Sequence, residues 1–355
     1  MVARTLEAAL SQSPLAFDHQ ATTPCAEEVV LAMAPYWSEH WGNPSSRQHR
    51  LGLTASAAVA VARKQLAACL EVTPERIVFT SGATEANNLA LLGHARALAD
   101  RKGRAGHLIS VQTEHHAVLD PLRQLEREGF QLTLLQPDAS GLIVPDQLAQ
   151  AIRNDTDLVS VMAANNEIGV LQPLSELAAI CRDRKITIHS DAAQAFGQVP
   201  LQPDAIGLDL LSLSAHKIYG PKGIGALVMR QGLPLQPLQW GGGQEAGLRP
   251  GTLAAPLIVG FAAAASLAMQ DLASRGERLG RLRDQLWLGL QNRIPGIQLN
   301  GASTPRLPHN LNITSSAVFS SSNTERKDEP PCTAPTTSQL TPHHHALQHK
   351  TRFRV

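Results

Sequence analysis

The sequence is poor in cysteine and has no excess of charge of one sign. Its 355 residues include four cysteines, Cys25, Cys69, Cys181 and Cys332, none of them in a CxxC or other metal-type spacing. The pattern therefore indicates neither a disulfide framework nor a metal site and favours a reducing compartment, the cytoplasm. The 31 basic and 30 acidic residues give a net charge of +1, which favours small-molecule chemistry over binding to nucleic acid or to a membrane surface.

A long apolar run is also missing from the N-terminus. Residues 1–14 carry Arg4 and Glu7 without a sustained hydrophobic stretch, which predicts neither a signal peptide nor a membrane anchor. What the chain does have is a hydrophobic content of 43%, enough for a sizeable core. Its length predicts one large domain and a smaller one.

Short apolar runs alternate with helical patterns along most of the chain. Strands are expected at 77–80, 108–111, 131–135 and 158–162 and in the runs that end at Asp191 and before Ser214; helices are expected at 26–37, 54–70, 117–128, 145–153, 174–184, 254–272 and 278–293, with one more that ends near residue 99. This alternation predicts an α/β fold with a mainly parallel sheet covered on both faces. Ligands gather beyond the carboxyl ends of such strands. Polar clusters fall at five of these ends, at 81–84, 114–116, 165–166, 191–194 and 214–217.

Lys217 and Asp191 are the central candidates among these clusters. Lys217 follows an apolar run and precedes Gly220-Pro221, so it stands where a buried strand ends. Partial burial lowers the pKa of a lysine, which lets its neutral amine form a Schiff base. A lysine of this kind, with a carboxylate such as Asp191 to hold a pyridinium nitrogen, is what pyridoxal phosphate (PLP) requires. Taken singly, Lys217 could be a surface loop residue and Asp191 a helix N-cap.

Other candidates follow neighbouring strands. Ser81-Gly82-Ala83-Thr84 begins a helix and could hold a phosphate, although a simple N-cap gives the same pattern. His115 could stack on a planar ring and shuttle protons, or it could be structural. Asn166 could hydrogen-bond a ring hydroxyl or a substrate carboxylate, or it could be a turn residue.

Together these runs resemble a known family. They match, in order over about residues 15–314, the cysteine desulfurases of the NifS and IscS type, which supply sulfur for iron–sulfur clusters and belong to the class V aminotransferases of fold-type I. The matching runs include Ala21-Thr22-Thr23-Pro24, Gly42-Asn43-Pro44-Ser45-Ser46, Phe79 to Glu85, Thr113-Glu114-His115, Asn165 to Gly169, Asp191 to Gln194, Ser214 to Gly225 and Gly241 to Thr252. Each run is weak by itself, and the ordered set is specific.

The resemblance implies a role for each matching residue. Lys217 would form the Schiff base with PLP, Asp191 would pair with its ring nitrogen, and His115 would stack on the ring and move protons. Asn166 and Gln194 would bond the ring oxygen. The phosphate would be held by Ala83, Thr84, Ser214 and His216, joined by Thr252 from the other subunit of a homodimer. The resemblance also implies L-cysteine as substrate, a sulfur-acceptor or scaffold protein as partner, and no metal.

The resemblance stops at Thr314, where a tail of different composition begins. Similar enzymes continue into a loop that carries a nucleophilic cysteine and then to an arginine that binds the substrate carboxylate. Here Ser, Thr, Pro and His dominate, which predicts a disordered tail over 315–355. Cys332 stands between Pro331 and Thr333, and Arg352 or Arg354 would have to replace the arginine. As a hypothesis, the change marks a frameshift or an incorrectly ended reading frame.

The sequence therefore predicts a domain plan and a function with alternatives. Residues 1–20 would be an N-terminal segment of the small domain, 21–255 the large PLP-binding domain and 256–314 a partial α+β small domain, whose loss of the other half would expose apolar surface on the helices from 254 to 293. The predicted function is conversion of L-cysteine to L-alanine with sulfur passed to an enzyme cysteine. The alternatives are a truncated product without catalysis and another class V enzyme such as a selenocysteine lyase.

Overall fold

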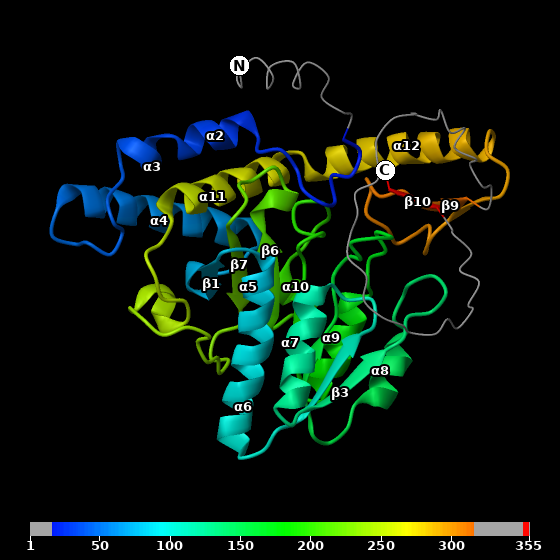
Figure 1. Ribbon diagram of the computed structural model, residues 1–355, viewed down its shortest axis with the longest axis horizontal. Helices are drawn as coiled ribbons and strands as arrows, with labels where there is room; N and C mark the ends of the chain where they lie inside the picture. Colours follow the sequence, from blue (N-terminus) through cyan, green and yellow to red (C-terminus); the bar gives the residue numbers. More distant parts are fainter. Residues whose placement is uncertain (1–15, 316–350, 355) are drawn as a thin grey trace, which may run out of the picture.

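A seven-stranded sheet lies at the centre of the molecule, in the order β1-β7-β6-β5-β4-β2-β3 (Figure 1). The computed structural model describes residues 16–315 and 351–354. The strands are β1 (Ile77–Thr80), β2 (His107–Val111), β3 (Gln131–Leu135), β4 (Thr156–Ser160), β5 (Thr187–Asp191), β6 (Leu210–Ser214) and β7 (Gly225–Met229). Strands β3, β2, β4, β5 and β6 run parallel to one another, and β7 is antiparallel to both β6 and β1. The predicted α/β fold with a mainly parallel sheet is confirmed.

Helices cover both faces of this sheet because its strands are apolar on both sides. In β6, Leu211 and Leu213 belong to the core beneath α4 and α11, while Leu210 packs with Ala86 of α5 on the other face. The helices of the first face are α4 (Arg50–Cys69), α9 (Leu174–Asp183) and α11 (Ala255–Gln270), and those of the second are α5 (Ala83–Asn88), α6 (His94–Lys102) and α7 (His116–Arg127). A π-helical turn, η2 (Leu89–Gly93), joins α5 to α6.

Shorter elements connect these layers. They are α2 (Glu27–Met33), α3 (Pro35–Ser38), α8 (Pro145–Ala151), α10 (Pro203–Ile206), η1 (Pro74–Arg76), η3 (Ala215–Lys217) and η4 (Gln244–Gly247). The helix expected at 26–37 is divided at Pro35, because proline lacks the N–H that would continue α2 and is well suited to the first turn of α3. Strand β4 begins at Thr156, two residues before the expected position.

Two buried histidines join neighbouring strands by side-chain hydrogen bonds. In β5, His189 pairs through Nδ1 with Ser160 Oγ of β4 at 2.9 Å and through Nε2 with Ser212 Oγ of β6 at 3.0 Å. His107 of β2 bridges Thr156 and Thr133 in the same way, at 2.8 Å on each side. Thr156 is therefore buried and paired, which explains why β4 begins with a polar residue.

A second sheet is small and antiparallel. Its order is β10-β9-β8, with β8 (Ile297–Leu299), β9 (Asn312–Ser315) and β10 (Thr351–Arg354), and α12 (Leu272–Gln291) precedes it in the chain. For four residues of the tail, the structure thus has a strand where the composition predicts disorder. Residues 316–350 and 355 lie outside the described residues, so the expectation for them stays a prediction, as do the domain boundaries.

The expected exposure of residues 254–293 holds for one helix and is wrong for the other. Helix α11 packs against α4 and α2 and buries most of its apolar side chains, so it belongs to the core of the large sheet. Helix α12 exposes Leu282, Leu286 and Leu288. No single described helix is long and apolar enough to cross a membrane, and α11 and α12 meet that test only as a pair bent by 71°.

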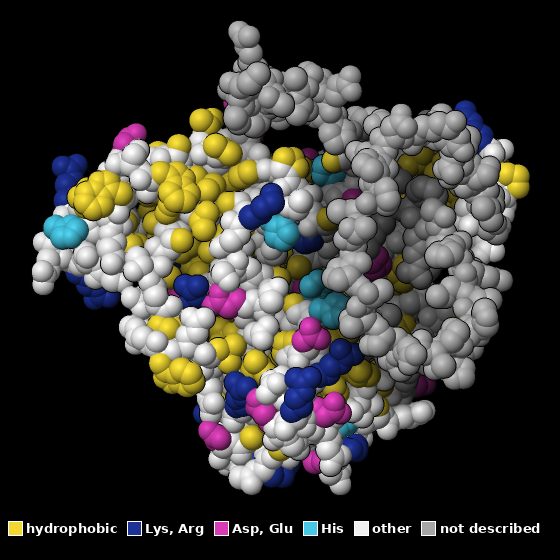
Figure 2. All heavy atoms as spheres, in the orientation of Figure 1, with side chains coloured by type: hydrophobic (Ala, Val, Ile, Leu, Met, Phe, Trp, Pro, Cys, Tyr) yellow, Lys and Arg dark blue, Asp and Glu magenta, His cyan; other side chains and the backbone are white. Residues whose placement is uncertain are grey.

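A larger apolar surface lies on the α2–α3 side of the molecule. Figure 2 shows hydrophobic side chains gathered there, over α2, α3 and the neighbouring α11. The exposed residues include Val30, Leu31, Trp37 and Trp41. Contiguous apolar surface of this kind marks an interaction site more often than an isolated exposed leucine does.

His189 predicts acid sensitivity of the fold. Burial lowers the pKa of His189 from 6.5 to about 3, so its folded-state pKa lies below that of the unfolded chain. Its contribution to stability is complete above pH 6.5 and is lost as the pH falls toward 3, since the unfolded chain binds the proton first. When the pH is lowered from 7.5 to 5.5, the free energy of unfolding of the parent protein should fall. We expect the fall in His189→Gln to be smaller by about 1 kcal/mol, measured by urea titration at both pH values.

The control for this experiment is His116→Gln, because the His116 side chain is 81% exposed. It should keep the pH dependence of the parent protein. A His189→Gln variant that loses as much stability on acidification as the parent would show that His189 does not carry this pH dependence.

Candidate active site

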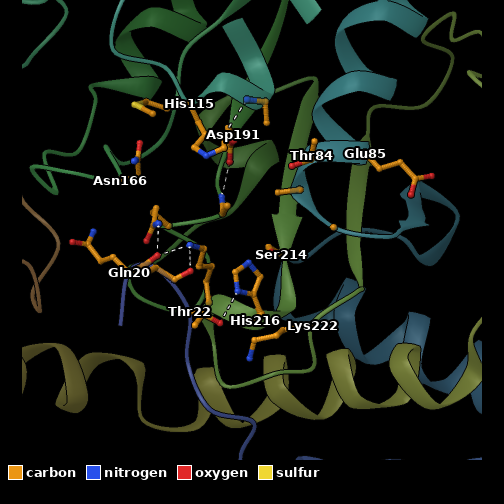
Figure 3. Close-up of a pocket in the computed structure, with 18 of the residues that line it drawn as sticks. Gln20, Thr22, Thr84, Glu85, His115, Asn166, Asp191, Ser214, His216 and Lys222 are labelled. Carbon is orange, nitrogen blue, oxygen red and sulfur yellow. Dashed lines mark hydrogen bonds between the residues drawn. The ribbon is translucent and has the colours of Figure 1, made fainter. Parts of the chain in front are cut away.

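Nine of the ten residues expected to hold a cofactor line one cavity of about 730 Å³ at the carboxyl ends of the strands (Figure 3). They are Ala83, Thr84, His115, Asn166, Asp191, Gln194, Ser214, His216 and Lys217. The tenth, Thr252, is exposed on the segment after η4 and does not line this cavity. Its predicted place is in the other subunit's site, so its role stays a prediction. Within the described residues, no group of three or more His, Cys, Asp or Glu side chains is placed to hold a metal ion.

Lys217 ends η3, the single 3₁₀ turn that follows β6. Its Nζ donates to the backbone carbonyls of Gln20 and Ala21, the latter at 2.9 Å. The Gln20 carbonyl also accepts the side-chain amide of Gln194 at 3.0 Å. The residues just before α2 therefore hold the lysine amine at the cavity wall.

Asp191 is the last residue of β5 and is only 8% exposed. Its Oδ2 accepts Asn87 Nδ2 at 2.6 Å, and its Oδ1 accepts the N–H of Ala193 at 2.9 Å. Burial raises the pKa of Asp191, while these hydrogen bonds and the charges of His115 and Lys217 oppose the rise. Among the described residues it makes no ion pair, so its carboxylate is oriented by neutral donors and is ready for a cationic partner in the cavity.

A second buried carboxyl lies behind the first. Glu114 Oε1 accepts the N–H of Met162 at 2.6 Å, and Oε2 has no hydrogen-bond partner among the described residues. Burial and the charge of Asp191 raise the pKa of Glu114 well above its ordinary value. Burial and the charge of Asp191 therefore both favour the protonated form of Glu114.

His115, the next residue, is the N-cap of α7. Its Nδ1 accepts the N–H of Ala117 at 3.0 Å, which leaves the proton of the neutral ring on Nε2. Its ring lies beside Asp191 in the cavity (Figure 3). An imidazole held in this way can stack on a planar group and exchange a proton through Nε2.

The turn from Ser81 to Thr84 forms the opposite wall of the cavity. Gly82, the N-cap of α5, has φ 156° and ψ 179°, a conformation that glycine adopts readily. A Cβ at Gly225 of β7 would lie 2.7 Å from the Gly82 Cα, so glycine is needed there for the turn to approach the sheet. The free N–H groups at the helix start and the Thr84 hydroxyl suit an anion such as a phosphate.

His216 and Ser214 complete this end of the cavity. Burial lowers the pKa of His216, and the positive charges of Lys217 and Lys222 lower it further, so the imidazole is neutral at pH 7. Its Nδ1 pairs with Thr22 Oγ1 at 3.0 Å. Ser214 is buried at the end of β6. Both side chains can bond an anion without bringing a charge of their own.

Asn166 lies across the cavity from this end, on the loop between β4 and α9. Its Nδ2 donates to Glu167 Oε1 at 3.1 Å, and its neighbour Asn165 fixes the loop by accepting the N–H groups of Glu167 and Ile168 at 2.9 and 3.0 Å. Asn166 is thus a residue of an ordered turn and also lines the cavity. Its place in a turn therefore does not exclude contact with a ligand.

The sequence does not identify several residues of the site. Asn87 orients Asp191, and the carbonyls of Gln20 and Ala21 hold Lys217, yet each lies more than 100 positions from its partner. The Ala21-Thr22-Thr23-Pro24 run is a visible signal for this segment, without a role attached to it. For Asn87 no local signal exists, because a helical asparagine is ordinary.

Comparison of the sequence with known proteins identifies the family of this chain. The model of the aminotransferase class-V family matches residues 15–325. This chain belongs to that family. It is 48% identical over 303 residues to the cysteine desulfurase IscS of Dechloromonas aromatica (strain RCB), which covers 85% of this chain and 74% of the relative.

Solved structures agree with the family assignment. A NifS-like protein superimposes with a TM-score of 0.80 at 37% identity, over 84% of this chain and 80% of that one. SspA in complex with cysteine gives a TM-score of 0.73 at 38% identity, over 84% and 83% of the two chains. The predicted fold-type I class and the predicted resemblance to cysteine desulfurases are both confirmed.

None of the three described cysteines is placed to act as a nucleophile at the cavity. Cys25, Cys69 and Cys181 are free thiols, and none lines the cavity. Burial raises the pKa of Cys25 and Cys69 and raises that of Cys181 to about 12. None of the three is activated as a nucleophile. Cys332 lies outside the described residues.

These raised pKa values predict slow thiol labelling of this class-V protein. In a Cys332→Ser variant at pH 7.5, we expect the three remaining thiols to react with a disulfide reagent about tenfold or more slowly than free cysteine, because the thiolate is the reacting form. The reagent is an aromatic disulfide, and the absorbance of the aromatic thiol that it releases on reaction is measured over time. The same variant in guanidinium should react rapidly at all three sites, and one fast equivalent in the folded variant would contradict the expectation.

Proposed function

We propose that this protein is a PLP-dependent cysteine desulfurase that converts L-cysteine to L-alanine. The observation that carries the proposal is the placement of Lys217, Asp191 and His115 on one cavity with an anion-binding turn at its far wall. The names of the relatives and the cysteine bound to SspA support the same choice of substrate. The cavity volume of about 730 Å³ is within the range of small-molecule sites.

The ring end of the cavity fits PLP. Asp191 has a buried carboxylate held by two neutral donors, which is the environment that a protonated pyridine nitrogen requires. His115 lies beside it, and the Lys217 amine is held at the same cavity by two backbone carbonyls. When bound, PLP supplies an electron sink for a carbanion at the substrate α-carbon.

The phosphate end fits as well. Thr84 and Ser214 supply hydroxyls, His216 supplies a neutral imidazole, and the start of α5 supplies backbone N–H groups. A phosphate would bind there through hydrogen bonds and the helix dipole. We assign Ala83, Thr84, Ser214 and His216 to the phosphate, and Asn166 and Gln194 to the ring oxygen and the substrate.

The chain's own residues then have defined tasks in the reaction. Lys217 and His115 move protons, the lysine through Nζ and the histidine through Nε2. In the net reaction, the C–S bond of cysteine breaks, its sulfur forms an S–S bond with an acceptor thiol, and the carbon takes up a proton. Cysteine and a thiol thus become alanine and a persulfide, with no further oxidant or reductant.

Whether the chain completes the reaction depends on an acceptor thiol for the sulfur. Because no described cysteine lines the cavity, sulfur has to pass to Cys332 or to a thiol from another molecule, such as a sulfur-acceptor or scaffold protein of iron–sulfur cluster assembly. Without such a thiol, the chain would bind PLP and turn over poorly. A selenocysteine lyase would act at the same cavity and differ in the amino acid that it prefers.

We also propose that the protein is a homodimer. The apolar surface of Val30, Leu31, Trp37 and Trp41 would be buried by a second copy, as would Trp240, which is 88% exposed. Thr252 would then reach the partner's phosphate. The free thiols of the described residues suit a reducing compartment, and we place the reaction in the cytoplasm.

Removing the Lys217 amine tests the cofactor assignment. With PLP added, the parent protein should show the visible absorbance of a covalently held cofactor, and Lys217→Ala should lose it. The other lysine that lines the cavity, Lys222, donates its Nζ to the Thr23 carbonyl at 3.4 Å, so the absorbance is expected from Lys217 alone. Lys64→Ala, on the outer helix α4, is the control and should keep the absorbance. Persistence of the same band in Lys217→Ala would overturn the assignment.

The products distinguish the candidate functions. With cysteine and dithiothreitol, an active desulfurase should form alanine and sulfide in equal amounts, and a PLP-binding chain without turnover should form neither. Comparison of Cys332→Ser with the parent shows whether the thiol comes from the tail. Alanine formed from selenocysteine and not from cysteine would favour the lyase.

Asn87 supplies a second test, at the ring end. Asn87→Ala removes a hydrogen bond that opposes the raised pKa of Asp191, so this carboxyl should become protonated at a higher pH. PLP release on acidification is monitored by absorbance. We expect the midpoint pH of this release to rise by about one unit in Asn87→Ala. Gln124→Ala is the control, because Gln124 does not line the cavity and its Nε2 donates at 3.0 Å to the exposed Glu128, at the C-terminal end of α7. An unchanged release profile in Asn87→Ala would show that Asn87 does not tune Asp191.

A further inference from the structure

The segment from Gly241 to Thr252, here called the connector, is largely exposed but firmly attached to the large sheet. Two ion pairs attach it. Glu245 pairs with Arg63 of α4 through both carboxylate oxygens, one of them at 3.0 Å from Nη1. Arg249 donates to Glu85 of α5, at 2.8 Å from Nε and 3.5 Å from Nη2. The Glu245 side chain is 1% exposed, so its pair is shielded from water.

Both carboxylates also accept a backbone N–H near the cavity. Glu245 Oε2 accepts the N–H of Phe79 at 2.6 Å, and Glu85 Oε2 accepts the N–H of Ser81 at 2.6 Å. Phe79 belongs to β1, the edge strand of the sheet, and Ser81 begins the turn that leads to Thr84. The Arg63 guanidinium accordingly donates to the Ile77 carbonyl at 2.5 Å. The two pairs thus take the place of a neighbouring strand along β1 and into the turn.

The connector itself has one well-defined shape. Glu245 and Ala246 have φ values of 47° and 55°, in the left-handed region that residues other than glycine seldom adopt. The Gln244 side chain accepts the N–H of Gly251 at 3.0 Å and closes the segment on itself. Residues in this conformation persist where the surroundings determine it, which here is the Glu245 anchor.

We propose that the connector positions the phosphate-binding turn, and that Arg249 acts as a positioning residue through Glu85 and Ser81. Thr84 and Glu85 both line the cavity, and the Glu85 carboxylate extends from α5 to the side away from His115 and Asp191 (Figure 3), where it accepts Arg249 of the connector. Holding Glu85 therefore fixes the start of α5 from outside and aims its N–H groups inward. This inference rests on the proposed cofactor, since it concerns the phosphate of PLP.

The charge state of Glu85 agrees with this role. Burial alone would raise the pKa of Glu85, but the hydrogen bonds from Arg249 and Ser81 outweigh it, and the net pKa is lowered. Glu85 is therefore ionised at pH 7 and keeps both contacts. Because Thr252 lies on the same segment, binding of a second copy to the connector would be linked to phosphate affinity.

The test compares PLP with pyridoxal, which lacks the phosphate. Dissociation constants for both are measured by absorbance on the full chain and on Arg249→Gln, Glu85→Gln and the double variant. We expect PLP binding to weaken about tenfold in each variant, pyridoxal binding to stay unchanged, and the double variant to be no worse than the single ones, because the two residues form one unit.

Arg96→Gln is the matched control. Arg96 makes an equivalent two-bond pair with Glu128, at 2.9 and 2.6 Å, on the surface away from the cavity. It should leave both dissociation constants unchanged. Arg249→Lys keeps the charge, and its PLP affinity should lie between those of the parent and Arg249→Gln.

Two outcomes would overturn the inference. One is an unchanged ratio of PLP to pyridoxal affinity in Arg249→Gln; the other is an equal weakening of both ligands, with a lowered midpoint of thermal unfolding, which would mean a purely structural role. A parent protein that binds neither ligand would overturn the proposed function instead, so the two failures are distinguishable.

Discussion

The site depends on one electrostatic constraint, the burial of the Asp191 carboxyl. A carboxylate out of water is unfavourable unless donors and a counter-charge surround it. Asn87 and the Ala193 N–H supply donors without cancelling the charge. Burial and the charge of Asp191 both raise the pKa of Glu114, which favours its protonated form. The surroundings thus orient the Asp191 carboxyl at the end of β5 toward the cavity, where the charges of His115 and Lys217 favour its ionised form.

Sheet topology brings the lysine to that carboxyl. β5 and β6 are neighbouring parallel strands, with Asp191 opposite Ser212, so the chain after β6 emerges at the same edge as Asp191. Lys217 follows within one 3₁₀ turn. Strand β1 has the same direction as β6, because β7 is antiparallel to both, and its turn therefore reaches the same cavity. One mainly parallel sheet consequently places an amine, an acid and an anion-binding turn together without a long excursion of the chain.

Local patterns predict the parts of the site that strand ends determine. The apolar runs indicate where β1, β2, β4, β5 and β6 stop, and polar residues at or beyond those stops line the cavity, which is why nine of the ten assigned residues converge there. Patterns of this kind carry no information about contacts between distant segments. The Gln20 carbonyl at Lys217, Asn87 at Asp191 and Glu245 at Phe79 are such contacts, and each depends on the packing of elements far apart in the sequence. The break between α2 and α3 at Pro35 was readable in principle, whereas the pairing of β10 with β9 was not.

The change in composition after Thr314 lies beyond every described residue that lines the cavity. Its lining residues all lie between Gln20 and Ile224, and the core beneath them is closed by α4, α9 and α11, with the last of these packed against the large sheet and not against the small one. In the proposed function, cofactor binding and sulfur acceptance would therefore depend on different groups. The first would depend on the cavity residues around Asp191, and the second on a thiol that the described residues do not bring to that cavity. Loss of the acceptor thiol would therefore leave the described cavity residues unchanged.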